Sequence, residues 1–170
     1  MTDTTAAVSG RSGHDSRSLM LFGGVYGAVL ASAMVAALTE HEHTTRADRR
    51  YDAAWLLVTA LASALAHGYA HLIADRDPRH RLQALRVLVD EWPLVVAMLP
   101  TVVILAGAGW GWWPANGVEL PAFVFNIVLL LVLGFLSARW AGRRWAAAVA
   151  TGVADALLGV IVVVANAIIK

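Results

Sequence analysis

The sequence predicts an all-α protein, an integral membrane bundle of five transmembrane helices, and three observations support this fold class. Of the 170 residues, 59% are apolar and only 15% are charged, whereas soluble domains are about half apolar and about a quarter charged. The chain contains five apolar runs, each close to the roughly 20 residues that a helix needs to cross a bilayer. Nearly all charged residues fall in the N-terminal segment and in the short loops between these runs.

The five predicted spans account for nearly the whole chain after a short tail. Residues 1–18 are rich in Ser, Thr, Gly and Asp, a composition typical of a flexible tail. Residues 19–170 then form a single transmembrane domain, with spans over 19–39, 53–74, 93–109, 121–137 and 145–169. Segment 79–91 is expected to form either a short amphipathic helix on the membrane interface or a solvated extension of the third span.

The first apolar run has a second interpretation, because Ala31-Ser32-Ala33 carries the small residues of a signal-peptide cleavage site. However, the apolar run continues beyond this point, whereas the apolar region of a signal peptide is about 7–15 residues long. We therefore expect the run to remain in the protein as a membrane anchor.

Basic residues in the tail and loops predict the orientation in the membrane. Nine of the thirteen arginines and lysines lie in the tail, the second loop and the fourth loop, and the other four lie in the first loop and at the C-terminus. Cytoplasmic loops carry an excess of lysine and arginine. The N-terminus is therefore predicted to be cytoplasmic and the C-terminus extracytoplasmic.

Small residues recur at a spacing of four in two of the spans and at spacings of four and three in a third, which predicts close helix packing. The first span contains a GxxxG pair, and the second and fifth contain similar series; the residues are Gly23 and Gly27, then Ala60, Ala64 and Gly68, then Gly152, Ala156 and Gly159. Small residues let helix backbones approach closely in a membrane. We expect these residues to pack helices within the chain, with a self-association face as the alternative.

Ionisable residues inside apolar spans are the candidate functional groups, because a charge is costly at membrane depth. The second span carries a polar ribbon spaced by four residues, which places its members on one helix face: Thr59, Ser63, His67, His71 and Asp75. Asp155 in the fifth span lies about 15 Å along the helix from Trp145, near the midplane. His67 has a similar predicted depth, so the sequence allows a His67–Asp155 pair.

Two asparagines in the later spans are predicted to form a structural polar pair. Asn126 and Asn166 both lie in the outer quarter of the membrane by the helical rise per residue. Their side chains are expected to bond across neighbouring helices.

The polar ribbon supports three hypotheses about function. The leading one is movement of protons or other ions through a small oligomeric bundle, because hydroxyl, imidazole and carboxylate groups in a row can relay protons; the path residues are His67, His71, Asp155, Asp75, Ser63 and Thr59. The alternative is a non-transporting scaffold or partner subunit whose polar residues are structural. The third is a divalent metal site at His67 and His71, whose imidazoles can reach one ion.

Other parts of the sequence narrow the function classes further. The Glu40-His41-Glu42-His43 stretch is expected to be a solvated loop, with weak surface metal binding as the alternative. The chain has no cysteine, which excludes thiolate chemistry. It contains no phosphate-binding loop, nucleophile elbow or HExxH sequence, so no enzyme activity is predicted. Both membrane histidines lie on one helix, which argues against haem, and no cofactor is expected.

The expected partners follow from the same composition. The formal net charge is +1, which gives no indication of nucleic-acid binding. The apolar spans predict contact with membrane lipid. Because five short helices enclose little volume, we also expect a homo-oligomer or a partner membrane subunit.

Several short motifs carry a resemblance to other proteins. They are Tyr26-Gly27, Ala66-His67-Gly68-Tyr69-Ala70, Glu91-Trp92-Pro93 with Pro100, Ala154-Asp155 and Leu158-Gly159. In these motifs the chain resembles a group of small multipass integral membrane proteins of unknown function from high-GC bacteria. The resemblance implies a multipass protein of the bacterial cell membrane, and it marks His67, Glu91 and Asp155 as positions to mutate.

Overall fold

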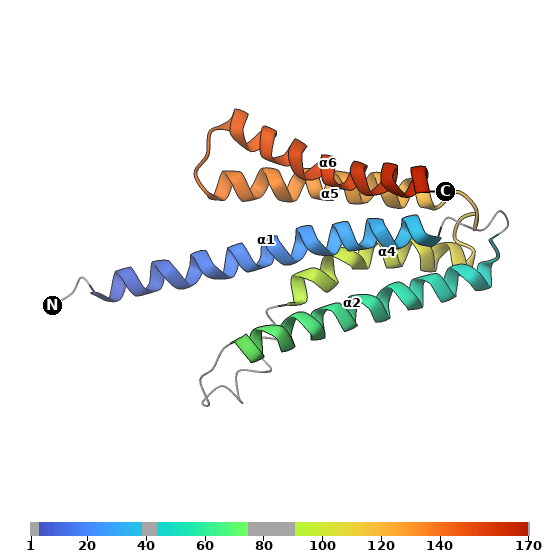
Figure 1. The fold of residues 1–170 in the computed structure, drawn as a ribbon, viewed down its shortest axis with the longest axis horizontal. Helices are drawn as coiled ribbons and strands as arrows, with labels where there is room; N and C mark the ends of the chain where they lie inside the picture. The colour runs from blue at the N-terminus through green and yellow to red at the C-terminus, as the bar shows by residue number, and fades with distance from the viewer. Residues whose placement is uncertain (1–3, 39–43, 75–90, 170) are drawn as a thin grey trace.

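The computed structural model describes residues 4–38, 44–74 and 91–169, and these residues form five α-helices (Figure 1). The helices are α1 (Thr4–Leu38), α2 (Arg46–Ala74), α4 (Trp92–Trp110), α5 (Glu119–Trp140) and α6 (Trp145–Ile169). Each contains a stretch long and apolar enough to cross a membrane. The prediction of an all-α bundle with five such helices is therefore confirmed. The many exposed apolar side chains on these helices fit contact with membrane lipid.

Two helices begin earlier than the sequence indicated. Residues 4–18 were predicted to be a flexible tail, but in the structure they belong to α1. The difference has a physical reason, since extending an existing helix fixes one residue for each hydrogen bond gained, whereas starting a helix is costly. The second predicted span began at residue 53, whereas α2 begins at Arg46.

The early start of α2 is explained by a capping interaction at its first turn. The backbone N–H of Thr45 donates to the Asp48 carboxylate at 2.8 Å, and the backbone N–H of Asp48 lies 3.2 Å from the Thr45 hydroxyl oxygen. This reciprocal pair satisfies two backbone donors that a helix start otherwise leaves unpaired. The predicted interfacial helix over 79–91 lies outside the described residues, apart from Glu91.

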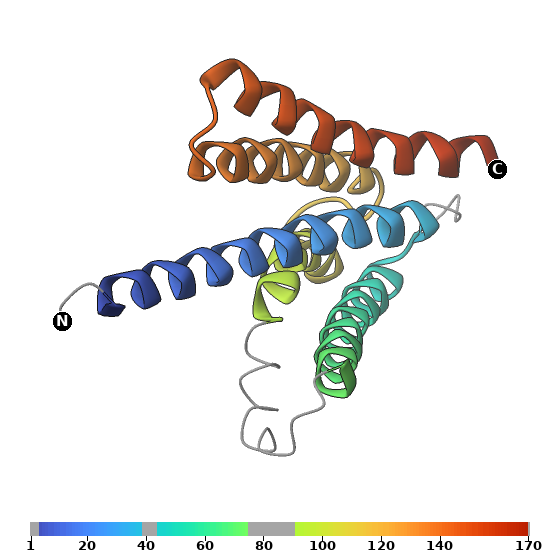
Figure 2. The same cartoon turned by 60° about the vertical axis from the view of Figure 1, so that its left-hand side comes forward.

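Helix α1 lies in the middle of the bundle and separates two helix pairs. Figures 1 and 2 show α5 and α6 side by side on one side of α1, and α2 and α4 on the other. The helix contacts agree, because α5 packs mainly on α6, α2 mainly on α4, and α1 contacts α4, α5 and α6. A cluster of buried apolar side chains lies between α1, α2 and α4; its members include Ala31, Leu56, Ala60, Leu94, Met98 and Leu105.

Glycines permit close approach on both sides of α1. A Cβ atom at Gly27 would lie 2.5 Å from the carbonyl oxygen of Leu94 in α4, and a Cβ atom at Gly152 would lie 2.5 Å from the carbonyl oxygen of Leu131 in α5. Any larger residue would force these backbones apart. The prediction that the small residues pack helices within the chain is confirmed at these positions.

Candidate functional site

Four polar or aromatic side chains from three helices meet at one end of the bundle, where α2 ends and α4 begins. His67 and His71 lie on the last turns of α2, Glu91 directly precedes α4, and Tyr26 lies on α1. His67 Nδ1 is 3.7 Å from Glu91 Oε2, and His71 Nε2 is 3.6 Å from Glu91 Oε1. We call these four residues the His67–Glu91 cluster, and this end of the molecule the Glu91 end.

Local sequence explains how Glu91 reaches the histidines. Glu91 is the N-cap residue of α4, and a proline follows in the first turn, where its missing N–H costs no hydrogen bond. The Glu91 side chain makes no capping bond to its own helix. Its carboxylate is thereby available to α2. His67 and His71 are spaced by four residues, so both imidazoles lie on the helix face that meets this carboxylate.

The side chains of the His67–Glu91 cluster differ in exposure. The Glu91 side chain is only 10% exposed, while those of His67 and His71 are 31% and 61% exposed. The Tyr26 ring lies 4.9 Å from the His67 ring, between centroids, at an angle of 38°. The cluster is therefore a nearly buried carboxylate whose neighbours become more accessible from His67 to His71.

The distances in the cluster are those of ionic contacts rather than of hydrogen bonds. Both nitrogen–oxygen separations exceed the 2.7–3.2 Å typical of an N–H···O hydrogen bond. An imidazolium would be attracted to the carboxylate, whereas a neutral imidazole would not form an ion pair with it. Histidine is the side chain whose charge changes most readily near neutral pH, so this contact depends on protonation.

The rest of the predicted ribbon continues along α2 away from Glu91. Thr59 and Ser63 are half-buried, at the edge of the face that packs on α4 through Ala60 and Ala64. Within the described residues, their hydroxyl groups make no hydrogen bond. Asp75, the last predicted member of the ribbon, lies outside the described residues.

The structure does not bring Asp155 together with the histidines, so the predicted His67–Asp155 pair is wrong. His67 lies on α2 and Asp155 on α6, and α1 stands between these two helices (Figures 1 and 2). The Asp155 carboxylate instead lies against Gly134 of α5. Depth along a helix was estimated from the sequence, but the direction that each side chain faces depends on how the helices pack.

Asn126 contacts a residue that the sequence did not suggest. It is fully buried, and its side-chain oxygen accepts a hydrogen bond of 3.0 Å from the hydroxyl of Thr101 in α4. Its side-chain nitrogen is buried without a partner among the described residues. The side chain of Asn166 lies outside the described part of the structure, so the predicted Asn126–Asn166 pair stays a prediction.

A buried ionic network at the opposite end was missed by the sequence reasoning. Arg49 is fully buried; its Nε donates to the carbonyl oxygen of Ala115 at 2.8 Å, and its guanidinium forms ion pairs with Asp52 and Glu119. We call this the Arg49 network. The signal was the three-residue spacing of Arg49 and Asp52, which places them on one helix face. By composition, Arg49 is one of the basic residues of the first loop.

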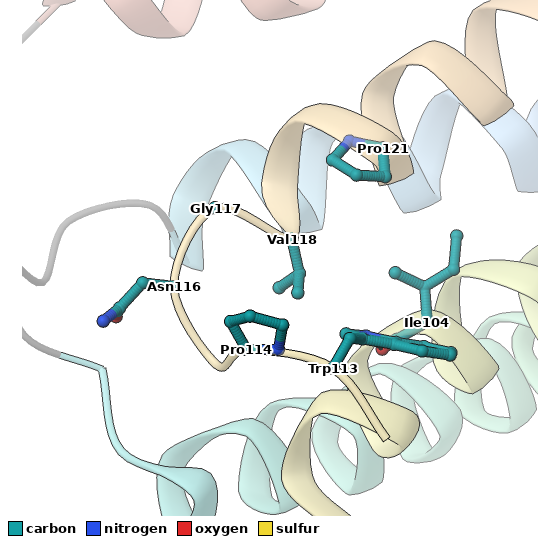
Figure 3. A pocket seen from close by; sticks show the side chains of 7 residues that line it. All are labelled: Ile104, Trp113, Pro114, Asn116, Gly117, Val118 and Pro121. Atoms are coloured by element: carbon teal, nitrogen blue, oxygen red, sulfur yellow. Dashed lines mark hydrogen bonds between the residues drawn. The ribbon is translucent and has the colours of Figure 1, made fainter. Parts of the chain in front are cut away.

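The end of the bundle that holds the Arg49 network also contains a pocket of about 350 Å³, between the end of α4 and the start of α5. Figure 3 shows Trp113 beside Pro114 and Ile104, with Asn116 pointing away from them. The indole N–H of Trp113 donates to the Ile104 carbonyl oxygen, and the Asn116 side-chain oxygen accepts from the Thr44 N–H. The Trp113 N–H and the Asn116 side-chain oxygen are therefore already bonded, and the lining contains no titratable or nucleophilic side chain.

The described residues contain no metal centre of three or more ligands, since no group of three His, Asp or Glu side chains among them is placed to hold a metal ion. The His67 and His71 metal site stays a prediction. The Glu40-His41-Glu42-His43 stretch lies outside the described residues.

Comparison of the chain with protein-family models, with curated proteins and with solved structures finds no match. The resemblance to small multipass proteins of high-GC bacteria therefore stays an expectation. Any function must be argued from the residues themselves.

Proposed function

We propose that this protein moves protons or other ions across a membrane, with the His67–Glu91 cluster as the group that exchanges protons at one end. The observation that carries the proposal is the nearly buried Glu91 carboxylate, with an imidazole nitrogen within 4 Å of each of its oxygens. A carboxylate in such a place needs a positive partner or a proton. An imidazole can supply either one, because it can carry a positive charge or donate a proton.

The side chains of the cluster differ in exposure, and this difference supports a direction in which a proton enters the protein. His71 is the most accessible member of the cluster, Glu91 is the least accessible, and His67 is intermediate. A proton taken up from water at His71 has Glu91 and then His67 within a few ångströms. Ser63 and Thr59 continue the same face of α2 toward the middle of the helix, where hydroxyl groups and water extend a relay.

The position of the polar ribbon supports an oligomer. Thr59 and Ser63 lie at the edge of the α2–α4 contact rather than inside the bundle, so in a single chain they would border lipid. Polar side chains in membrane helices generally face another helix or a water-filled space. We therefore propose that the path lies between copies of the chain, each contributing the ribbon of its α2 helix.

The proposal is tested by proton flux in proteoliposomes loaded with a pH-sensitive dye, with a potassium diffusion potential as the driving force. Glu91→Gln keeps the shape of the side chain but removes its charge and its ability to exchange a proton. We expect flux in the wild type and a loss of at least about tenfold in this variant. His67→Gln should reduce flux more than His71→Gln, because His67 lies between Glu91 and the hydroxyl groups of Ser63 and Thr59.

A matched control is Asp48→Asn, which makes the same change of carboxylate to amide at the far end of α2. The side-chain oxygen of asparagine can still accept the Thr45 N–H, so this variant should keep its fold and its flux. Absence of flux from well-folded wild-type protein would overturn the proposed function. Equal flux in wild type and Glu91→Gln would remove the cluster from the path.

The oligomer is tested by disulfide cross-linking, since the chain has no native cysteine. Ser63→Cys should form cross-linked dimers in the membrane if the ribbons of two copies face each other. Leu61→Cys, on an exposed apolar face of the same helix, should stay monomeric under the same oxidation. Cross-linking through Leu61→Cys but not Ser63→Cys would contradict a path between the ribbons.

A scaffold or partner subunit without transport is the second candidate, and it is favoured by the Arg49 network and by the Thr101–Asn126 bond. Both are polar contacts that join neighbouring parts of the bundle and that do not continue into a row of polar side chains. If the His67–Glu91 cluster has the same role, Glu91→Gln should lower thermal stability while wild-type protein carries no flux. A stabilisation by divalent cations that His67→Ala abolishes would instead favour the predicted metal site.

A further inference from the structure

Asp155 is a carboxyl group within the membrane-spanning part of α6 that has no polar partner among the described residues. The span covers Trp145–Ala165, and Asp155 lies near its middle. The side chain is half-buried. No hydrogen bond or ion pair joins it to any residue that the structure describes, in contrast to Arg49 and Glu91. An unpaired carboxylate is costly at membrane depth.

The space beside the carboxyl group is created by two glycines. A Cβ atom at Gly134 would collide with Asp155 Oδ2 and would lie 2.9 Å from Gly152 Cα. Nearby hydroxyl groups do not serve the carboxyl group, because Ser137 donates to the Gly134 carbonyl oxygen and Thr151 to that of Ala147. Asp155 is therefore placed against bare backbone, with no donor directed at it from these side chains.

Among the described side chains, the helices that contact α6 supply no charged group that pairs with Asp155. On α5 the charged residues are Glu119, which pairs with Arg49, and Arg139, whose guanidinium donates to the Arg143 carbonyl oxygen and lies over the Trp145 ring. On α1, between Met20 and Leu38, the only titratable side chain is Tyr26, which lies against His67. Asp155 is the only charged residue of α6 itself.

We infer that Asp155 is a proton-binding site within the membrane: a carboxyl group that is neutral when the α5–α6 hairpin is in the bilayer and that exchanges its proton with water. The ligand is the proton, since the site offers one carboxyl group and no further oxygen donors from side chains to enclose a metal cation. The site is separate from the His67–Glu91 cluster, because α1 lies between them. It does not rest on the proposed ion movement.

The test is modification with an apolar carbodiimide, dicyclohexylcarbodiimide, which enters bilayers and reacts with protonated carboxyl groups. The acid proton moves to one reagent nitrogen while a carboxyl oxygen bonds to the reagent carbon. The acyl group then shifts from that oxygen to a nitrogen, giving a stable N-acylurea with the mass of one added reagent molecule. Tandem mass spectrometry of wild-type protein in liposomes should locate this product on Asp155.

The pH dependence has a definite sign, because only the protonated acid reacts. Labelling of Asp155 should be greatest at acidic pH and should decrease as the pH is raised. A water-soluble carbodiimide should leave Asp155 unmodified while it labels exposed acids such as Asp48. Asp155→Asn should lose the labelled peptide, and Glu91→Gln should retain the label at Asp155.

Three results would overturn the inference. Absence of label on Asp155 at every pH would mean that the carboxylate is ionised and paired. Labelling that does not change with pH would contradict exchange of the proton. Protection by sodium ions at constant pH would assign the site to an alkali cation. Labelling does not require ion flux, so the two assays are independent. Absence of flux would contradict the proposed function but not the proton site at Asp155, and absence of labelling would contradict the proton site but not the proposed function.

Discussion

The two sides of α1 are held together by different chemistry. On the side of α2 and α4, charged groups are buried at both helix ends, in the Arg49 network and in the His67–Glu91 cluster. On the side of α5 and α6, helices approach through Gly134 and Gly152, and the only charged residue of α6 has no partner among the described residues. Polar contacts near helix ends can share water, whereas those at mid-membrane cannot.

This difference separates polar residues with a structural role from candidate functional residues. Polar residues that have found partners, such as Arg49 with its two carboxylates, are explained by the fold. Glu91 and Asp155 are not explained in this way, because one contacts groups whose charge depends on protonation and the other contacts backbone. We therefore propose both as proton sites, and variants on each side of α1 test how far the difference between the two sides holds.

The largest expected effect comes from breaking the Arg49 network. Arg49→Ala removes a fully buried guanidinium, and with it the ion pairs to Asp52 and Glu119 and the hydrogen bond to the Ala115 carbonyl oxygen. Removing one partner of a buried ion pair costs about 3–5 kcal/mol, and we expect a loss of stability in that range in thermal or denaturant unfolding in detergent. Arg144→Ala, at an exposed position, is the matched control. Equal stability of the two variants would contradict a structural network at this end.

A smaller effect is expected from filling the glycine contacts, and here the two sides should behave alike. Gly27→Ala places a methyl group against the Leu94 carbonyl oxygen, and Gly152→Ala places one against that of Leu131. Overpacking of this kind costs about 1–3 kcal/mol. Ala154→Val, at an exposed position on α6, adds apolar volume without a collision. If Gly152→Ala were as stable as this control in detergent unfolding, the close contact between α5 and α6 would be refuted.

The smallest effect concerns the polar bond between the two sides, from Thr101 in α4 to Asn126 in α5. Thr101→Val should cost about 0.6 kcal/mol, the average for polar contacts between membrane helices. Asn126→Leu removes both the accepting oxygen and the unpartnered nitrogen, so its net cost should be close to zero. A double-mutant cycle measures the coupling, and a coupling of several kcal/mol would mean that this bond, rather than packing, joins the two sides.

Much of the fold could be predicted because the membrane imposes simple rules on sequence. The apolar runs located the five spans, and the start of the last at Trp145 agrees with the structure. The early start of α2 was missed because the capping residues Thr45 and Asp48 precede an ion-rich turn, which composition alone assigns to a loop. The α1 extension was missed because Gly and Ser are poor helix formers, although a helix that has already formed extends at little cost.

The candidate site was predicted in its residues but not in its contacts. His67 and His71 were identified by their spacing on one helix, which is a local property. Their partner was not found by spacing, because Glu91 comes from another helix end and its direction depends on how α4 packs against α2. Glu91 entered only through the resemblance, as a position to mutate. Arg49 was overlooked for a similar reason, since nothing local distinguishes a buried loop charge from a solvated one.

The sequence by itself determined the fold class of this protein, the number of its spans and which ionisable residues lie within those spans. These features follow from hydropathy and helical periodicity, which need only the order of residues along the chain. Only the tertiary structure decided that α1 separates His67 from Asp155, that Glu91 is the carboxylate of the histidines, and that Gly134 faces Asp155. Partners across helices depend on the rotation and packing of each helix, and these are set by close contacts between residues far apart in the sequence.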